Sequence, residues 1–466
     1  MFFVSQFSSG ILAFLLLPLY TRYLAKEQYG TADLIATSVN LLMPVFTLCI
    51  SQATLRFAMI ERADKRHIFS FGLKVITAGF FLLLAGYPLL NNIAGIEKYL
   101  HLFYMLYIAS SIDTHLSYFA RAINKVVLVG VSGVIKTIVM IGANLILLIV
   151  FNLGITGYVV SSVLSHVASI IILSLGGKLY SYYTIKKPDT AYEREMLIYS
   201  VPLVPNSLSW WLSNYASRYI ILLFCGVGAQ GMFAVASKVP AILTTVQIIF
   251  IHAWQLSAIS EYDKPRRDEF YSRIYKLYNI GMVFCAAILI LFVRVIARLL
   301  FAGEYYEAWV YVPMLLVAVV FGALSGFLGT FFAAGKRNEA MFTSTLIGGI
   351  SAVTINIALV PSFGPVGASI AAVAANIIVW MIRLVKSRKY ANLNAETVHS
   401  CLCYVLLILQ ASCMMYFKGW NGYIGAALVL VFLIAINITY IKYLLRFTVD
   451  IIKKTKKERL LWEENG

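Results

Sequence analysis

Charge is scarce in this sequence, and acidic residues are scarcer than basic ones. Charged residues make up 13% of the 466 residues, and 21 acidic residues stand against 38 basic ones. In soluble domains about a quarter of the residues are charged, so this composition excludes an ordinary soluble protein. With 61% hydrophobic residues and a mean hydropathy of +0.82, the chain is instead predicted to be a polytopic membrane protein.

Recognisable catalytic and metal-binding patterns are also missing. The sequence contains no Walker A loop, no Gly-x-Ser-x-Gly turn, no His-Glu-x-x-His helix and no Cys-x-x-Cys pair. Its six cysteines lie within or beside apolar runs and lack metal-site spacing with a histidine, which indicates buried thiols rather than disulfides or ligands. The predicted outer loops are too short to carry an enzymatic site. We therefore expect a protein that is not an enzyme and that needs no metal and no cofactor.

About fourteen apolar runs of roughly 20 residues follow one another along the chain, each long enough to cross a bilayer as a helix. They lie near residues 1–20, 34–57, 69–90, 102–120, 127–151, 156–175, 199–224, 232–254, 277–301, 310–334, 341–360, 366–386, 398–417 and 423–445. The predicted fold class is therefore an all-α polytopic membrane protein. The first run has no charged segment before it and no clear cleavage site, so we expect a retained helix rather than a signal peptide.

The basic residues indicate how the spans are oriented. Most of the 38 lysines and arginines fall in every second connection and in the C-terminal tail, whereas the alternate connections hold few. Cytoplasmic segments carry such an excess, so both termini are predicted to be cytoplasmic. Because this bias explains the net charge of +17, we expect no nucleic-acid partner. The basic tail, 447–466, is predicted to be solvated or to face lipid headgroups.

The spans divide into two groups of six and a final pair. The longest connection, 178–195, separates an N-terminal lobe (1–177) from a C-terminal lobe (196–390), and a further helix pair occupies 391–446. The turns Glu27–Leu34 and Ala229–Val235 resemble each other, and each places a glycine before a helix with small residues. Duplicated halves of this kind are a transporter architecture, so a substrate site is expected between the lobes near the middle of the bilayer.

The stretch Tyr199–Pro240 is predicted to form one wall of a polar cavity. It reads as two helices joined by a glycine-rich turn, with prolines inside both and with polar and charged residues at membrane depth. Proline within a spanning helix is tolerated where neighbouring protein or a cavity satisfies the freed backbone groups. A charge at the centre of a span costs about 2.5–3.5 kcal/mol on insertion scales and rarely faces lipid.

The charges inside the spans are mostly positive. Lys136, Arg218 and Lys238 are expected to face the interior, whereas Lys74 lies near a helix end where its ammonium can reach the headgroups. Asp113 is the one acid placed in a predicted span, and it is explained equally by a structural pairing with Lys136 and by proton coupling. The histidines show no metal-ligand spacing. An excess of cations suits an anionic substrate such as a diphosphate or an acidic sugar.

Several strings distributed over nearly the whole chain are typical of one family. They are Pro18–Leu34, Val201–Ile221, Gly231–Leu243, Ala253–Glu261, Tyr305–Phe321, Phe327–Lys336 and Pro361–Ala371. The chain resembles the Wzx-like oligosaccharide flippases of the polysaccharide transport group, in the superfamily that includes MATE exporters. The resemblance implies two six-helix lobes plus two extra helices, a V-shaped cavity and a lipid-linked oligosaccharide cargo. Many relatives carry an acid just before the arginine of the seventh span; here Ser217 takes that place, so Arg218 is expected to be freer to bind an anion.

This resemblance and the charge pattern lead to one functional hypothesis. A bacterial inner-membrane flippase would move an undecaprenyl-diphosphate-linked repeat unit to the outer leaflet, for O-antigen, capsule or exopolysaccharide synthesis, with a polymerase and chain-length machinery as further partners. H⁺ or Na⁺ is the expected coupling ion, and Asp113 the candidate coupling acid. The other candidate residues are the substrate-binding cations Lys136, Arg218, Lys238, Lys74 and Arg56, and the sugar-contacting Asn206, Trp210, Trp211 and Asn214. The tryptophans are equally explained as interfacial anchors.

Two other functions stay open at this point. A MATE-like ion-coupled exporter of small molecules would share the fold, although cationic drugs call for intramembrane carboxylates and this interior has the opposite charge. A membrane glycosyl polymerase or ligase would need a larger outer loop than this sequence has.

Overall fold

The computed structural model describes residues 14, 16–61, 63–90, 97–184, 190–261, 267–334, 338–388, 397–417 and 419–440. The regular structure in these ranges is helical, without a strand. Nine of the described helices are long and apolar enough to cross a membrane, and the bent pair α3–α4 makes a tenth. The predicted all-α polytopic membrane fold is confirmed. Most of the first predicted span and all of the basic tail lie outside the described residues.

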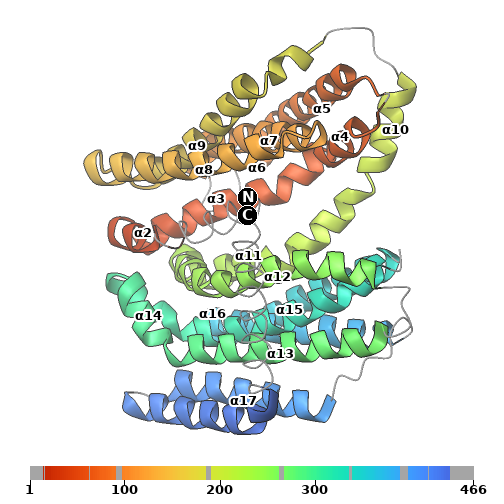
Figure 1. Cartoon of the computed structure of the whole chain (residues 1–466). Helices are drawn as coiled ribbons and strands as arrows, with labels where there is room; N and C mark the ends of the chain where they lie inside the picture. The colour runs from red at the N-terminus through yellow and green to blue at the C-terminus, as the bar shows by residue number, and fades with distance from the viewer. Residues whose placement is uncertain are drawn as a thin grey trace, which may run out of the picture.

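The first half of the chain forms a group of helices on one side of the molecule (Figure 1). Its main helices are α2 (Leu17–Tyr23), α3 (Lys26–Phe46), α4 (Ile50–Ala58), α5 (Lys65–Ala85), α7 (Leu100–Ala122), α8 (Val126–Asn144) and α9 (Gly154–Gly176). Short elements join them, namely α6 (Tyr87–Leu90), η1 (Glu97–Tyr99), η2 (Leu145–Val150) and η3 (Leu179–Tyr182). The Asp64 carboxylate caps α5 by accepting from the backbone of Arg66 and His67.

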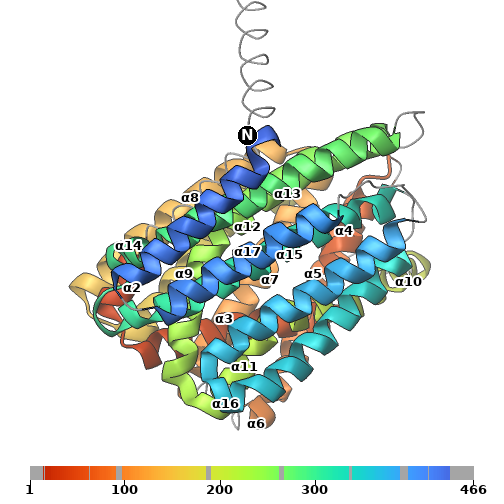
Figure 2. The same cartoon turned by 90° about the horizontal axis from the view of Figure 1, so that it is seen from below.

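The second half forms the other group, and the final helix pair packs against its outer side (Figures 1 and 2). Helix α10 (Thr190–Ser200) packs against α4 of the first group and leads into the second. The elements of the second group are α11 (Leu203–Ala236), α12 (Lys238–Ser260), α13 (Arg267–Leu291), α14 (Val293–Leu300), η4 (Gly303–Tyr311), α15 (Val312–Ala334), α16 (Asn338–Ser387), α17 (Thr397–Tyr416) and a last helix at Trp420–Tyr440. The long helix α11 lies beside α3, between the two groups (Figure 1). The lobe boundaries given above stay a prediction.

Two glycines break the longest helices. Gly226 in α11 has φ 84° and Gly364 in α16 has φ 57°, a backbone region that glycine enters without a steric penalty. Helix α16 folds back on itself at this break, as shown by the hydrogen bond that Arg383 in its second arm donates to the Ser344 hydroxyl in its first arm (Nε–Oγ 3.0 Å). The two arms correspond to the predicted spans 341–360 and 366–386.

Helix burial shows which helices are enclosed by others. The apolar window of Gly303–Phe332, which contains α15, is 83% buried inside the protein, whereas that of Val126–Val150, which contains α8, is only 17% buried. The core of the second group accordingly forms around aromatic residues such as Phe327 of α15, which stacks on Trp254 at 4.6 Å between ring centroids. In a bilayer, α15 is surrounded by protein and α8 presents most of its surface to lipid.

One cation within the predicted span 277–301 proves to be structural. Arg294 of α14 is buried and donates to the carbonyls of Met414, Phe417 and Gly419, where α17 ends. Its guanidinium also lies 4.3 Å from the centre of the Trp309 ring. These bonds satisfy carbonyls that the end of a helix leaves unpaired, so Arg294 attaches the final helix pair to the second group.

Candidate functional site

The two groups of helices meet where two turns of similar sequence touch. A Cβ atom added at Gly30 of α3 would lie 2.5 Å from the Val227 carbonyl oxygen, and one added at Gly231 of α11 would lie 2.0 Å from the Lys26 carbonyl oxygen. Both distances are far below van der Waals contact, so the two backbones can approach this closely only at glycine. The sequence resemblance between the two turns thus corresponds to a contact between them in space.

A buried ion pair follows one turn further along α3. The Arg218 Nε atom lies 2.7 Å from the Asp33 carboxylate, and the side chains are only 9% and 11% exposed. The same Asp33 oxygen accepts a hydrogen bond of 3.0 Å from the Gln230 amide. The Arg218 guanidinium also lies over the Tyr215 ring, 4.7 Å from its centre. This cluster therefore joins α3 to both parts of α11.

The ion pair corrects the expectation that Arg218 is freer to bind an anion. The absence of an acid at Ser217 is real, but Asp33 of α3 supplies a carboxylate from the other half of the chain. Asp113 is likewise not the one carboxylate in the interior. The sequence prediction placed Asp33 in an outer turn, whereas α3 begins at Lys26, so that Asp33 lies inside the helix and is buried.

Lys238 stands at the start of α12, close to this cluster. It is half-buried, and the charges of Asp33 and Arg218 both act on it. In the described part of the chain no carboxylate forms an ion pair with Lys238. The cluster of Asp33, Arg218 and Lys238 thus holds two cations and one anion, which leaves one positive charge in excess.

Further polar contacts continue along the boundary between α3 and α11. The Ser38 and Tyr219 hydroxyls are 2.5 Å apart, and the Trp211 indole N–H donates to the Thr37 carbonyl at 3.1 Å. We call the boundary that runs from the Gly30–Gly231 contact through Asp33–Arg218 to Ser38–Tyr219 the α3–α11 seam. The contacts along this seam between the two halves of the chain are thus largely hydrogen bonds and an ion pair rather than an apolar core.

A second charged cluster lies within the first group of helices. Asp113 of α7 accepts from Lys136 of α8 at 2.7 Å, and its other oxygen accepts from the Ser169 hydroxyl of α9 at 2.6 Å. His166 Nδ1 lies 2.8 Å from Asp113 Oδ2 and 2.9 Å from Lys136 Nζ. A neutral Nδ1 can donate to the carboxylate or accept from the ammonium, but it cannot do both. The imidazole therefore has two hydrogen-bonded arrangements in one site.

The contacts of Asp113 bear on the two explanations given for it above, a structural pairing with Lys136 and proton coupling. The Lys136–Asp113 pair is formed, with the lysine side chain 31% exposed and the aspartate 7%. The pair accounts for the charge of Asp113 without coupling, and the contacts of His166 with both partners leave proton coupling as the other prediction.

A double substitution separates these interpretations. Asp113→Asn is expected to lower the unfolding free energy by about 2 kcal/mol, because Lys136 loses its carboxylate and charge-assisted bonds are lost. Asp113→Asn combined with Lys136→Met should regain most of that loss, since no charge is then left unpaired. A melting temperature of the double variant below that of Asp113→Asn would contradict the pairing. Transport lost in a double variant of normal stability would favour coupling.

The other predicted site residues do not join either cluster. Arg56 is exposed with its guanidinium 4.5 Å from the Tyr199 ring centre, and Lys74 is exposed on α5, as expected for a lysine near a helix end. Trp211 is buried in the seam, which disagrees with a sugar-contacting role in this conformation. The remaining three, Asn206, Trp210 and Asn214, recur every fourth residue of α11 and share one exposed face.

Comparisons with known proteins agree with this architecture. The chain belongs to the polysaccharide biosynthesis protein family, whose model matches residues 1–259. It is also 27% identical over 262 residues to an uncharacterised membrane protein of Methanocaldococcus jannaschii. That match covers 52% of this chain and 49% of the relative, so the chain aligns with about half the length of this relative.

Solved structures share the fold at low sequence identity. The lipid II flippase MurJ in an inward closed conformation matches with a TM-score of 0.70 and 14% identity, over 95% of this chain and 99% of that one. An inward-facing multidrug resistance MATE family transporter of the MOP superfamily gives 0.65 and 13%, over 83% and 98%. A MOP superfamily transporter from Pyrococcus furiosus gives 0.56 and 13%, over 83% and 93%. The family match and these structures together identify a member of the polysaccharide biosynthesis protein family with the all-α polytopic fold that MurJ and the MATE proteins have.

Proposed function

We propose that this protein is a flippase that moves a polyprenyl-diphosphate-linked oligosaccharide from the cytoplasmic to the outer leaflet of a bacterial inner membrane. The observation that carries the proposal is that a member of a polysaccharide biosynthesis family has the fold of MurJ and MATE transporters. The barrier to such a movement is the transfer of hydrated sugars and a diphosphate through hydrocarbon. Polar groups between the two helix groups would replace the lost water, while the polyprenyl chain stays in lipid.

The α3–α11 seam is the element that we propose to open and close. Its members come from the two halves of the chain, and the Gly30–Gly231 contact lies where two similar turns meet. Opening would expose the Asp33–Arg218 pair together with Lys238. An anionic headgroup would then compete with Asp33 for Arg218. Its binding would shift the equilibrium towards the open seam by an amount set by the ratio of its affinities for the open and the closed conformation.

The charges of the site set limits on the cargo. Because Lys136 and Arg218 each contact a carboxylate, the interior excess is smaller than the sequence predicted. We propose that Lys238 meets the diphosphate first and that Arg218 joins it when Asp33 is displaced. The exposed face of α11 with Asn206, Trp210 and Asn214 would contact the sugars. H⁺ or Na⁺ as coupling ion, a polymerase and chain-length machinery as partners, and cytoplasmic termini belong to the same proposal.

The proposal is tested by locating the lipid-linked repeat unit in cells that lack this protein. An impermeant reagent that oxidises sugar diols from outside should fail to modify the repeat unit in the deletion strain and should modify it after complementation. A polymerase or ligase defect would instead leave the unmodified repeat exposed outside. Resistance to cationic drugs that falls on deletion, with normal exposure of the repeat, would contradict the proposal and favour a MATE-like exporter.

A further inference from the structure

Helix α10, which connects the two groups of helices, is docked on the first group. The ring of Phe57 in α4 meets the rings of Tyr192 and Tyr199 in α10 edge-on, at 5.5 and 6.1 Å between centroids. The Arg56 guanidinium also lies over the Tyr199 ring, 4.5 Å from its centre. Three aromatic rings and one guanidinium thus hold α10 against α4. We call the pair of helices α4 and α10 the base.

Buried contacts extend the base into the first group. Met196 of α10 is buried in an apolar core to which α4, α5 and α7 also contribute. The Glu193 carboxylate of α10 lies 3.3 Å from Nε2 of His67 in α5, and these side chains are only 17% and 10% exposed. Separating α10 from these helices would uncover apolar surface and a buried polar contact, which is unfavourable. We therefore expect α10 to follow the first group when the two groups move.

The bend between α3 and α4 brings α4 into this position. The two helices meet at 58°, and the residues between them include Leu48 and Cys49, which have φ of 50° and 54°. Residues with a Cβ atom rarely adopt this left-handed region, and they keep it only where the surrounding structure holds them there. The Cys49 sulfur lies 3.7 Å from the Ser207 hydroxyl oxygen of α11. The bend in the first group therefore adjoins the first turns of α11.

In the described part of the chain, few backbone hydrogen bonds cross from α10 to α11. The Val201 N–H donates to the Leu197 carbonyl at 2.9 Å, and the Val204 N–H donates back only as far as the Val201 carbonyl, at 3.0 Å. Pro202 at the N-terminus of α11 and Pro205 in its first turn have no backbone N–H to donate towards α10. The two residues between the helices can therefore change their backbone angles with little loss of hydrogen bonding.

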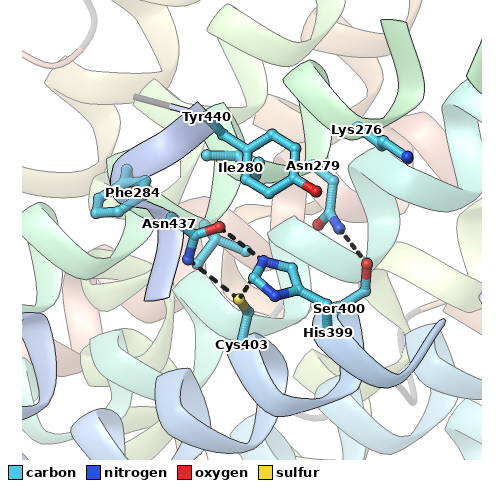
Figure 3. A pocket seen from close by; sticks show the side chains of 10 residues that line it. Lys276, Asn279, Ile280, Phe284, His399, Ser400, Cys403, Asn437 and Tyr440 are labelled. Atoms are coloured by element: carbon cyan, nitrogen blue, oxygen red, sulfur yellow. Dashed lines mark hydrogen bonds between the residues drawn. The ribbon is translucent and has the colours of Figure 1, made fainter. Parts of the chain in front are cut away.

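The second group is bonded internally as far as its last helix pair (Figure 3). The Asn279 amide of α13 donates to the Ser400 hydroxyl of α17 at 3.1 Å. His399 Nε2 of α17 lies 3.0 Å from the amide oxygen of Asn437 in the last helix. Arg294 joins α14 to the end of α17, and α11 packs on α16 of the same group. The second group and α11 are therefore expected to rotate as one unit.

The end of the seam that lies far from the base is also held by contacts between the two halves of the chain. Lys26 of α3 forms an ion pair of 2.9 Å with Glu304 of η4, and the Thr21 hydroxyl of α2 donates to the Leu300 carbonyl of α14 at 3.0 Å. A rotation displaces each point in proportion to its distance from the axis. A rotation about the residues between α10 and α11 would therefore separate these contacts furthest.

We propose that α10 stays docked on the first group and that Val201–Pro202 is the hinge about which the second group rotates to open the α3–α11 seam from its outer end. The base stays closed during this rotation, and the contact of Cys49 with Ser207 lies near the axis. The cavity would then open towards the outer leaflet. The role of this rotation in export depends on the proposed function, whereas the rotation itself does not.

Distances between pairs of spin labels, measured by electron paramagnetic resonance on the full-length protein in lipid nanodiscs, test the hinge without a transport assay. The natural cysteines are replaced by serine, and exposed residues are labelled in pairs at three levels. These are the outer level (Glu27→Cys with Leu223→Cys), the middle level (Asn40→Cys with Asn214→Cys) and the base (Met59→Cys with Ile198→Cys).

The expected changes follow from the distances to the hinge. At 1.5 Å per residue along α11, Leu223 lies about 32 Å from Pro202 and Asn214 about 18 Å. Gly231→Ala, whose added methyl group would meet the Lys26 carbonyl at 2.0 Å, should lengthen the outer distance almost twice as much as the middle distance and leave the base distance unchanged. The matched control Gly133→Ala should change none of the three distances.

Three results would overturn the proposal. A base distance that lengthens as much as the outer distance would mean that α10 follows α11. Equal lengthening at the outer and middle levels would mean that the groups separate without a hinge. Unchanged distances at all three levels would mean that the seam does not open from its outer end.

Crosslinks connect the hinge to export. His67→Cys and Glu193→Cys, whose native side chains lie 3.3 Å apart, fix α10 to the first group when they are joined, and export should continue as before joining. Joining Lys26→Cys to Glu304→Cys at the outer end should abolish export. Loss of export after the first crosslink, or normal export after the second, would also overturn the proposal. Absence of export before any crosslink, together with the expected label distances, would contradict the proposed function but support the hinge.

Discussion

Arg218→Ala is expected to abolish export of the lipid-linked repeat unit and to lower the unfolding free energy by about 3 kcal/mol. The large effect arises because Asp33, 11% exposed, would remain buried without the cation that lies 2.7 Å away. We also propose that Arg218 exchanges its contact with Asp33 for a contact with the phosphate of the cargo. Its removal is therefore expected to abolish transport as well as to lower stability. Thermal unfolding of the purified protein and the accessibility of the repeat unit in cells measure the two effects separately.

A paired variant shows whether the contact is electrostatic. Asp33→Asn with Arg218→Met removes both charges and should recover at least half of the lost stability, since no unpaired charge stays buried. Export should still fail, because no cation remains to receive the phosphate. Normal export by a stable paired variant would show that the ion pair is only structural.

Gly231→Ala is expected to force α3 and α11 apart and to stop export. The added methyl group would lie 2.0 Å from the Lys26 carbonyl oxygen and 3.0 Å from the Gly30 nitrogen, and backbone atoms cannot move aside as a flexible side chain can. Either the helices separate or the helix ends distort. In a variant without the natural cysteines, the thiol of Ser38→Cys should then react with a water-soluble maleimide about ten times faster, which corresponds to about 1.4 kcal/mol in the opening free energy.

The matched control for this variant is Gly133→Ala in α8. No atom lies within 4 Å of a Cβ built at Gly133, and the position is helical. Alanine there should leave export and thiol reactivity unchanged and should stabilise the helix by up to about 1 kcal/mol. Unchanged Ser38→Cys reactivity in Gly231→Ala would mean that the seam does not depend on the glycine contact.

The span pattern could be predicted from sequence because it depends on local properties. A run of about 20 apolar residues between charged connections is visible without knowing any partner, and helices such as α5, α9 and α17 occupy the expected runs. The Lys136–Asp113 pair is one of the two expected alternatives, since a lysine and an acid at membrane depth in neighbouring helices stabilise each other. Here the local pattern and the tertiary contacts lead to the same result.

The seam could not be predicted in the same way, because its contacts join residues far apart in the chain. Asp33 was assigned to a turn, since the apolar run starts after it, whereas the helix begins a full two turns earlier at Lys26. An interior partner for Arg218 was sought at Ser217, the adjacent position, but the partner came from α3. One signal was available. The turns around Gly30 and Gly231 resemble each other in sequence, which indicates that the two halves of the chain are related. Related halves can pack about a common symmetry axis, where equivalent turns can meet.

The adjacent residues Trp210 and Trp211 of α11 lie in different environments, which the sequence alone does not show. Trp211 faces α3 and is buried, whereas Trp210 is 54% exposed. Adjacent residues of a helix point about 100° apart, so one of them can close the seam while the other faces cargo or lipid. We therefore expect sugar contacts at Trp210 rather than at Trp211 in this conformation.

The central claim, movement of a polyprenyl-diphosphate oligosaccharide by this chain alone, is tested most directly in proteoliposomes. A fluorescent polyprenyl-diphosphate oligosaccharide is incorporated on both leaflets, and an impermeant quencher reports the fraction accessible from outside. With wild-type protein, quenching should rise from about half towards completion as the lipid exchanges between leaflets, and with Arg218→Ala it should stay near half. Equal quenching with wild type, Arg218→Ala and protein-free vesicles would contradict the account.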